Sequence, residues 1–435
     1  MKKFFFFWNE LKATFWFVPV VIITGAVLLA IGFIYLDGAI TFSQTGPGRF
    51  FLVNNPDSAR SILSTISGAM IGVAGTVFSV TLVALTLASS QFGPRLIKNF
   101  MYVRLNQIVL GSYISTYLYC LIVLNAVKES SENYFIPSLS ILFAIIAAIF
   151  NIILLIVFIH RIAVSIQADK VISDIASFIS KQVTVLFPEK MGDEPEAGQD
   201  LHVDEQKASY QTVLSVKCPC SGYFQYVDSA SLLALITKNH AMLELHYRPG
   251  DYLIDNLEIG KLYTDKPLDP DQIAQLLSCL VIGKTKTAQQ DLEFSIHQMV
   301  EIAARALSPG VNDPYTAIAC IDHLSATMCY LAQVKFPSKY RVDENNNLRV
   351  IANSLDFEGV LDAAFNQIRQ FAAGSTAVII RLMEVLTIIL GFTSKENQKK
   401  AVIKHARMTL AVGKQSIKET NDLNDLTERA QKILN

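Results

Sequence analysis

The polar residues best placed for chemistry outside the apolar segments lie between positions 291 and 313. Four of them bracket a predicted helix and the turn that ends it: Asp291, Arg305, Asn312 and Asp313. Because a guanidinium group binds carboxylates and phosphates, these residues are a candidate ligand pocket. The alternative is structural, with Asp291 capping its helix, Arg305 pairing with a nearby acid, and Asn312, Asp313 and Pro314 capping the next helix. We favour the structural interpretation.

Metal motifs are incomplete. His297 and Glu301 lie one helical turn apart and share a face, which supplies only half of a metal site. The sequence contains no HExxH motif and no paired Cys/His spacing. Asp322 and His323 could add a third ligand, but a chance surface pair is the simpler interpretation. We therefore predict no metal site and no cofactor.

Catalytic motifs are incomplete as well. Cys218 and Cys220 are spaced too closely for a zinc knuckle without a second pair. The segment GKTKT at 283–287 has the lysine of a phosphate loop, but Ser278 stands where the upstream glycine belongs. No GxSxG and no Gly-rich dinucleotide loop occurs. Because no catalytic constellation is complete, we predict that the protein has no catalytic residues and is not an enzyme.

A different pattern runs along the second long apolar segment. From Ser61 to Ser90 the chain carries no charge and is crowded with Gly, Ala, Ser and Thr. Steps of three and four residues give one helical seam, hereafter the small-residue seam: Thr65, Gly68, Gly72, Gly75, Ser79, Leu82, Thr86 and Ser89. Gly68 and Gly72 also form a GxxxG pair, which lets two helix backbones approach closely.

The small-residue seam has two interpretations. It packs against other spans, within one chain or between subunits, or copies of it surround an axis and line a narrow pore. A small, hydroxyl-bearing wall suits a pore because it tolerates water or ions without burying a charge. Arg95 and Lys98 follow the segment and would then ring the inner mouth and favour anions. The alternative is that both cations anchor the helix at anionic lipid headgroups.

Membrane helices must position this seam. The 435-residue chain is 51% apolar and 17% charged, which excludes a simple soluble enzyme, a disordered chain and a disulfide-built secreted domain. A span needs roughly 20 apolar residues. Four segments qualify, at about 15–36, 62–88, 108–127 and 136–159. No span carries a central acidic residue, so a proton relay is not supported.

Charge is distributed unevenly. Residues 1–165 hold ten Lys/Arg against five Asp/Glu, or +5, whereas residues 166–435 hold 27 against 33, or −6. Basic residues gather at the N-terminus, between spans two and three, and after span four. The positive-inside rule therefore places both termini in the cytoplasm. No clustered basic face suggests a nucleic-acid partner.

The expected fold is an α-helical integral membrane protein with four transmembrane helices and a cytoplasmic α+β domain. The expected parts are a transmembrane domain at 1–165, a connecting helix and flexible acidic loop at 166–207, a β-rich module at 208–268 and a helical domain at 269–435. The module is predicted from alternating β-formers and from the Pro249–Gly250 turn. Asp269 before Pro270 is a helix N-cap and marks the change to helical periodicity.

Two stretches resemble a known family. The segments STISGAMIGVAGTVFSVTLVALTLASSQFGPRLIKNF and TAQQDLEFSIHQMVEIAARALSPGVNDPYTAI are similar to a widespread bacterial family of predicted integral membrane proteins of unknown function. The resemblance covers most of residues 60–330 and implies four spans before a cytoplasmic domain, in the bacterial inner membrane. It implies nothing about mechanism.

Two functional hypotheses follow. The first is a homo-oligomeric inner-membrane pore for small ions, lined by the second span and permeable to anions. The second is a membrane-anchored sensor or scaffold, in which the spans dimerise through Gly68 and Gly72 and the soluble domain binds a ligand or protein partner. Both place the first 165 residues in contact with membrane lipids.

Overall fold

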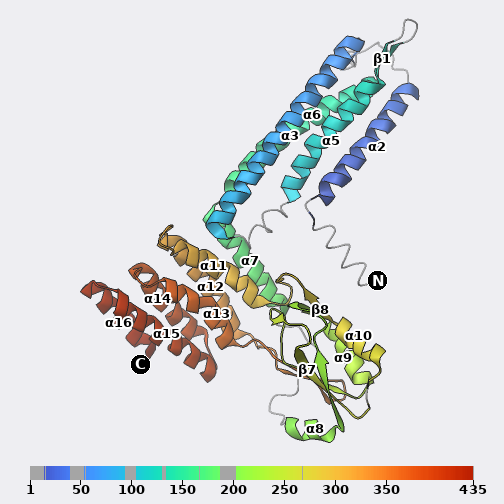
Figure 1. Cartoon of the computed structure of the whole chain (residues 1–435). Coiled ribbons are helices and arrows are strands. Elements are labelled where there is room, and N and C mark those ends of the chain that lie inside the picture. Colours follow the sequence, from blue (N-terminus) through green and yellow to red (C-terminus); the bar gives the residue numbers. More distant parts are fainter. Residues whose placement is uncertain are drawn as a thin grey trace. The chain divides into compact units, whose positions relative to one another are not determined.

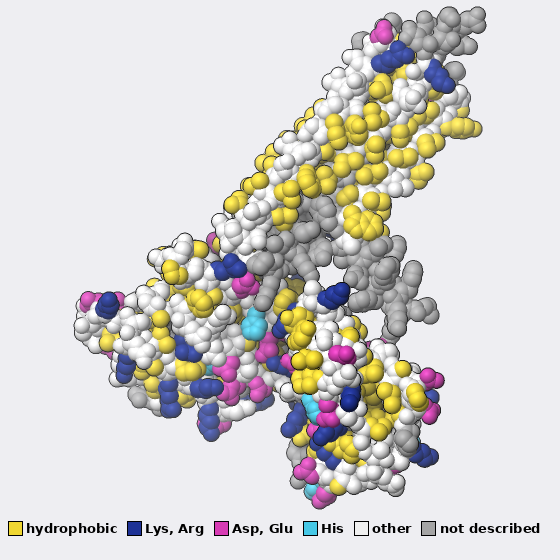
Figure 2. All heavy atoms as spheres, in the orientation of Figure 1, with side chains coloured by type: hydrophobic (Ala, Val, Ile, Leu, Met, Phe, Trp, Pro, Cys, Tyr) yellow, Lys and Arg dark blue, Asp and Glu magenta, His cyan; other side chains and the backbone are white. Residues whose placement is uncertain are grey.

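The chain folds into two compact units, Met1–Lys170 and Val171–Asn435. A computed structural model describes residues 14, 16–39, 53, 55–93, 104–129, 134–165, 167–186, 202–266 and 268–434 (Figure 1). Hydrophobic side chains cover the helices of the first unit, and charged side chains gather on the second (Figure 2). Each unit is considered by itself below.

The first unit contains four helices long and apolar enough to cross a membrane, as predicted. They are α2 (Phe17–Ala39), α3 (Pro56–Phe92), α5 (Arg104–Ala126) and α6 (Ser138–Ser165). The short strands β1 (Lys128–Glu129) and β2 (Tyr134–Phe135) pair between α5 and α6. Asn55 begins α3 as its N-cap, with its side chain accepting a hydrogen bond from the Asp57 amide, and Pro56 occupies the first helical position.

Helix α5 packs against α2, α3 and α6, and its polar side chains face the interior. The Tyr113 hydroxyl donates to the Asn151 carbonyl over 2.7 Å, and the Asn151 amide donates to Thr116 Oγ1 over 2.8 Å. Ser115, Thr116 and Tyr119 are all buried. These polar side chains therefore link α5 to α6.

Asp37 joins the first and last spans at one end of the unit. Its carboxylate accepts hydrogen bonds from the Leu139 and Ser140 amides and from the Ser140 hydroxyl, over 2.9, 3.0 and 2.6 Å. These amides belong to the first turn of α6, where the helix dipole favours a negative charge. A carboxylate at the end of α2 thus caps a helix about 100 residues later in the chain.

Helix α7 (Ala168–Leu186) follows α6 in the sequence, and all but its first three residues belong to the second unit. A connecting helix was expected in this region. The acidic loop expected at 188–207 lies outside the described residues up to position 201, and its end forms α8 (Val203–Ser209).

Among the described residues of this unit, eight strands form two sheets. The five-stranded sheet has the order β3 (Thr212–Lys217), β7 (Glu258–Thr264), β5 (Met242–Leu245), β10 (Leu348–Ala352), β9 (Tyr340–Val342). The three-stranded sheet has the order β6 (Tyr252–Leu253), β4 (Gly222–Val227), β8 (Leu280–Gly283). Helices α9 (Ser229–Lys238) and α10 (Pro270–Ser278) complete the module.

The module draws strands from the region expected to be helical. Strand β8 pairs antiparallel with β4, and β10 pairs parallel with β5, Val350 lying opposite Leu243. Both residues are fully buried. The hairpin α11 (Leu292–Ala306) and α12 (Pro314–Gln333) is thus inserted between β8 and β9. Strands from before and after position 268 therefore pair with one another in both sheets.

After β10 the chain forms α13 (Phe357–Phe371), α14 (Thr376–Phe392), α15 (Glu396–Ser416) and α16 (Thr420–Leu434). These helices pack with α11 and α12 into one bundle. Its interior is aliphatic, with Val360, Leu382, Leu386 and Leu426 at most 1% exposed.

We expect residues 168–435 to unfold in one transition, because strands from both ends of this region share its sheets. Fragment 202–268 is expected to stay unfolded, since β4 and β5 lose β8 and β10. Circular dichroism at 222 nm and tyrosine fluorescence during urea unfolding of both fragments would check this. A folded 202–268 fragment, or two separate transitions in the longer one, would contradict the shared-sheet interpretation.

Candidate functional site

Helix α3 has two different faces. Its buried face packs against α5 and α6 and consists of Ala59, Leu63, Ser67, Met70, Ala74, Val77, Thr81, Ala88 and Phe92. Most members of the small-residue seam stand two positions before one of these buried residues in the sequence. Two positions along a helix correspond to a rotation of about 200° around its axis. The seam therefore lies opposite the packed face. Seven of its members are exposed and Ser89 is half-buried.

The seam is narrow and close to the backbone. A Cβ atom built on Gly68, Gly72 or Gly75 would meet nothing within 4 Å among the described atoms. Large apolar side chains border it, with Ile71, Phe78, Val83 and Leu87 between 44% and 59% exposed. A groove of small residues between large ones is the surface that a second helix packs into.

Hydroxyl groups along α3 are bonded to their own helix. Thr86 Oγ1 donates to the Leu82 carbonyl over 2.9 Å, and Thr76 Oγ1 donates to the Gly72 carbonyl over 3.2 Å. Their protons are thus satisfied without a partner helix, and their oxygen lone pairs remain available as acceptors. The surface of α3 can therefore meet lipid, water or another helix.

The outward faces of the neighbouring helices are chemically different. On α6 the exposed residues are mainly large and aliphatic, namely Ile146, Ile149, Phe150, Ile152, Ile153, Ile156, Val157 and Ile159. On α2 they include Val20, Val21, Leu28, Leu29 and Ile31. Such side chains suit acyl chains, whereas small residues are enriched where membrane helices meet. The seam is thus unlike the lipid-type surface beside it.

Helix α3 ends at Gly93, its C-cap. Gly93 adopts φ = 109° and its amide donates to the Ser89 carbonyl over 3.2 Å. A positive φ favours glycine, which explains this residue at the helix end. The inner-mouth cations Arg95 and Lys98 lie outside the described residues, as do Lys2, Lys3 and Lys12.

The second unit, Val171–Asn435, is called the soluble unit below. Its four candidate pocket residues do not converge. Asp291 Oδ1 accepts from the Phe294 amide over 2.9 Å and caps the start of α11. Asp313 accepts from the Thr316 amide over 3.1 Å and caps α12. The 15-residue α11, about 22 Å long, separates Asp291 from the other three residues.

The remaining pocket residues make local contacts of the structural kind. Arg305 Nη2 lies 3.3 Å from Glu301 Oε1 on the same helix. Asn312 adopts φ = 48°, a left-handed conformation that Asn tolerates better than most residues, in the turn before α12. Thr316 and its hydrogen bonds to the Asp313 carboxylate lower the pKa of that group. Capping and pairing thus account for these side chains.

Asp291 has a second, unusual oxygen. The residue is 5% exposed, and its Oδ2 has no hydrogen-bond partner among the described residues. Gly250, at φ = 105°, lies so close that a Cβ there would collide with Oδ2. Burial raises the pKa of the Asp291 carboxyl, against opposing effects of the Phe294 amide, Lys286 and Arg248.

The segment around Asp291, here called the 288–295 junction, holds several elements together. Gln182 of α7 donates to the carbonyls of Ala288 and Asp291, and its Oε1 accepts from Ser295 Oγ over 2.6 Å. The side chain of Gln290, within the same segment, exchanges hydrogen bonds with both backbone groups of Val227, the last residue of β4.

The junction also reaches the turn between β5 and β6. Arg248 Nη2 pairs with Glu293 Oε2 over 2.7 Å. Sequence patterns did not indicate Gln182, Arg248 or Gly250 as partners of Asp291. The one available signal was the position of Gln182 on the stripe of buried residues along α7.

In the part of the chain that the structure describes, no group of three or more His, Cys, Asp and Glu side chains could hold a metal. Burial raises the pKa of the Cys218 thiol, whereas Cys220 is exposed. In the 283–287 segment, Lys286 lies over the Tyr223 ring, and Gln225 donates to the Thr285 carbonyl.

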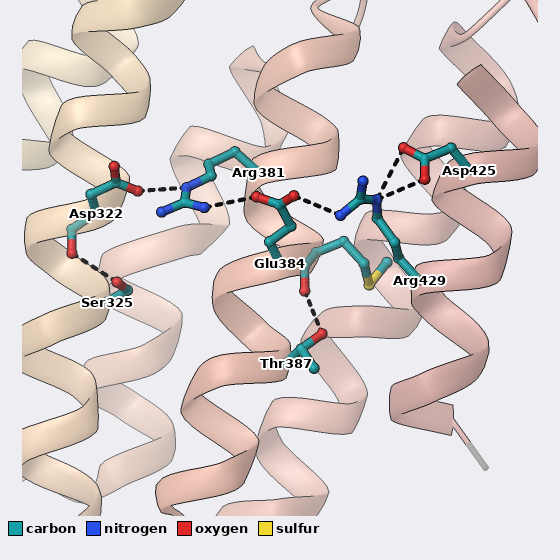
Figure 3. Close-up of polar contacts among 8 residues, drawn as sticks. Asp322, Ser325, Arg381, Glu384, Thr387, Asp425 and Arg429 are labelled. Atoms are coloured by element: carbon teal, nitrogen blue, oxygen red, sulfur yellow. Dashed lines mark hydrogen bonds and ion pairs between the residues drawn. The ribbon is translucent and has the colours of Figure 1, made fainter. Parts of the chain in front are cut away.

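Asp322 belongs to an ion chain that links three helices (Figure 3). Arg381 of α14 lies 2.7 Å from both Asp322 of α12 and Glu384. Glu384 lies 2.6 Å from Arg429 of α16, which also pairs with Asp425 over 2.9 Å. These side chains are between 30% and 42% exposed, so each pair contributes modestly. This series of ion pairs connects α12, α14 and α16 within the bundle.

Comparisons with known proteins place these features in a family. A family described as "Predicted membrane protein (DUF2254)" matches residues 12–387. An uncharacterized protein of Mycobacterium bovis and two of Mycobacterium tuberculosis are each 31% identical over 346 residues, covering 78% of this chain. The aligned part spans 65% of the length of those relatives. No solved structure matches.

We expect D291A to unfold with about 1 kcal/mol less stability than D291N, because only Asn keeps the oxygen that caps α11. Since the folded-state pKa of Asp291 is raised, its protonated form is favoured by folding. That contribution is complete below about pH 3.9 and is lost as pH rises through the folded pKa. D291N should therefore gain stability over the native protein as pH increases. Urea unfolding of residues 168–435 at several pH values measures both effects, and a constant difference between native and D291N would contradict the second.

Proposed function

The chain belongs to the DUF2254 family of predicted membrane proteins, and on that premise we propose that it works as a homo-oligomer whose subunits meet along the small-residue seam of α3. In this arrangement, copies of α3 surround a common axis and line a narrow pore for small ions. The soluble unit then forms a vestibule or gate, and the protein has no enzymatic role.

The observation that carries this proposal is the position of the seam. It lies opposite the face that packs against α5 and α6, with its glycines open to a neighbour. Three spans thus leave uncovered the one face whose residues are suited to close helix contact. A second copy of the same helix fits this face, because each copy presents a row of small side chains bordered by large ones.

A pore needs a wall that tolerates water. The small-residue seam is uncharged, and the Thr86 and Thr76 hydroxyl protons are occupied by backbone carbonyls, which leaves acceptor oxygens toward the axis. In this proposal Arg95 and Lys98 stand at the inner mouth and favour anions. By the positive-inside rule, both termini and the soluble unit are cytoplasmic, and the membrane is the bacterial inner membrane.

The second candidate is a dimeric membrane-anchored sensor or scaffold. Here Gly68 and Gly72 form one close two-helix contact, and the soluble unit binds a ligand or a protein partner. The observation that favours it is the junction around Asp291, where a buried carboxyl could couple a binding event to α7. The subunit number separates the two candidates, because two copies of α3 cannot enclose an axis.

We expect native mass spectrometry of the intact protein in mild detergent to find four or more subunits, and G72L to break this assembly. Leucine at position 72 fills the groove into which the neighbouring helix packs. The matched control is G32L, since Gly32 on α2 is also exposed with no described atom near its Cβ position. A monomer in the native protein, or equal assembly of G72L and native protein, would exclude the α3 interface.

We expect chloride efflux from liposomes that contain the native protein, with at least a tenfold loss in G75L and little change in G32L. A side chain at position 75 would point toward the axis, where a leucine obstructs passage. Chloride-sensitive dye in the liposome lumen provides the measurement. If G75L assembles normally and conducts as the native protein does, the pore is wrong even though the oligomer stands.

A further inference from the structure

Helix α7 is the first element of the soluble unit and follows the last membrane helix directly. Val171, Ile172, Ile175, Ile179 and Val183 are at most 7% exposed and form one stripe along it. At the end of this stripe, Gln182 is also buried and makes the polar contacts to the 288–295 junction. The stability of that junction therefore determines how stably the end of α7 is bound to the rest of the unit.

Asp291 is the member of the junction that is both titratable and buried, at 5% exposed. As an acid, it is neutral and leaves Oδ2 against Gly250 without the cost of a buried charge. As a carboxylate, it holds a negative charge on a buried oxygen that has no donor among the described residues. The charged form thus requires a hydrogen-bond donor or a cation at Oδ2 from the surrounding segment, whereas the neutral form carries no charge that needs one.

We propose that Asp291 is a proton-operated latch that sets how firmly the last turn of α7 is held at the 288–295 junction. When Asp291 is protonated, the hydrogen bonds between Gln182 and the junction are intact. Loss of the proton weakens these hydrogen bonds. This inference concerns the soluble unit alone and holds whether or not α3 lines a pore.

Charged groups from three elements surround Asp291. The loop before it contributes Lys286, the turn after β5 contributes Arg248, whose amide donates to Asp251, and α11 contributes Glu293. From α7 the facing residue is the uncharged Gln182. The two cations have other contacts, since Arg248 pairs with Glu293 and Lys286 lies over the Tyr223 ring.

The carboxylate can gain a donor in two ways. Either cation moves from its present contact toward Oδ2, or water enters beside Gly250. Both changes displace the backbone of residues 288–291, whose carbonyls accept the hydrogen bonds of Gln182. Deprotonation therefore weakens these bonds at the end of α7.

The response must be local. Undocking the whole of α7 would expose its five buried aliphatic side chains, which is more than a single ionisation can offset. The latch thus acts on the end of α7 and on residues 288–295, and the start of the helix stays in place. This limit supplies an internal control within the same helix.

Hydrogen–deuterium exchange of the full-length protein in lipid nanodiscs, from pH 5 to pH 8, tests the latch. The measured quantity is the protection factor, which corrects for the intrinsic pH dependence of amide exchange. In the native protein we expect protection at residues 180–183 and 288–295 to fall at least tenfold over this range. Residues 171–176 should stay constant within twofold.

Three variants decide between the latch and a general effect of pH. D291N should remove the pH response, and K286M should shift its midpoint to higher pH because it removes a cation that favours the carboxylate. D322N, which alters a carboxylate of the ion chain, should respond as the native protein does. A flat native profile, an unchanged response in D291N or an unshifted midpoint in K286M overturns the proposal.

Discussion

A bilayer interior supplies no hydrogen-bond partners, and this constraint arranges the whole membrane unit. Helix α5 buries several polar side chains, so it lies where other helices can satisfy them. Tyr113, Thr116 and Asn151 form such a buried set between α5 and α6. With α5 surrounded, the other helices pack around it, and α3 is left with one face inside and one outside. The exposed small-residue seam is a consequence of this arrangement.

The soluble unit obeys a comparable constraint, because each interior strand of a sheet needs a neighbour on both sides. Strand β5 obtains one neighbour from β7 and the other from β10, which the chain reaches only after the α11–α12 hairpin. The bundle and the sheets are therefore parts of one structure. The junction around Asp291 lies where the chain leaves β8 and enters α11, so contacts made there affect both parts.

Sequence reasoning was strongest where signals are local. Four long apolar runs predicted the four spans, and Asp291 and Asp313 were recognised as caps because a cap acts within three residues of itself. It missed β9 and β10, which are three and five residues long and too short for a periodic pattern. The contact of Gln182 with Ser295 spans 113 positions, and no local pattern encodes it. The outward direction of the seam likewise depends on which helix occupies the centre.

The insertion of α11 and α12 between β8 and β9 also sets an order of events during synthesis. Strand β5 leaves the ribosome with β7 soon behind it, but β10 emerges roughly 100 residues later, or about 5–20 s at ordinary translation rates. During that interval the edge of β5 carries unpaired backbone groups and the fully buried Leu243 is uncovered. By then all four membrane helices have been made. The nascent soluble unit therefore waits for its central strand while already tethered, which keeps other copies of the same open edge at a distance set by the membrane.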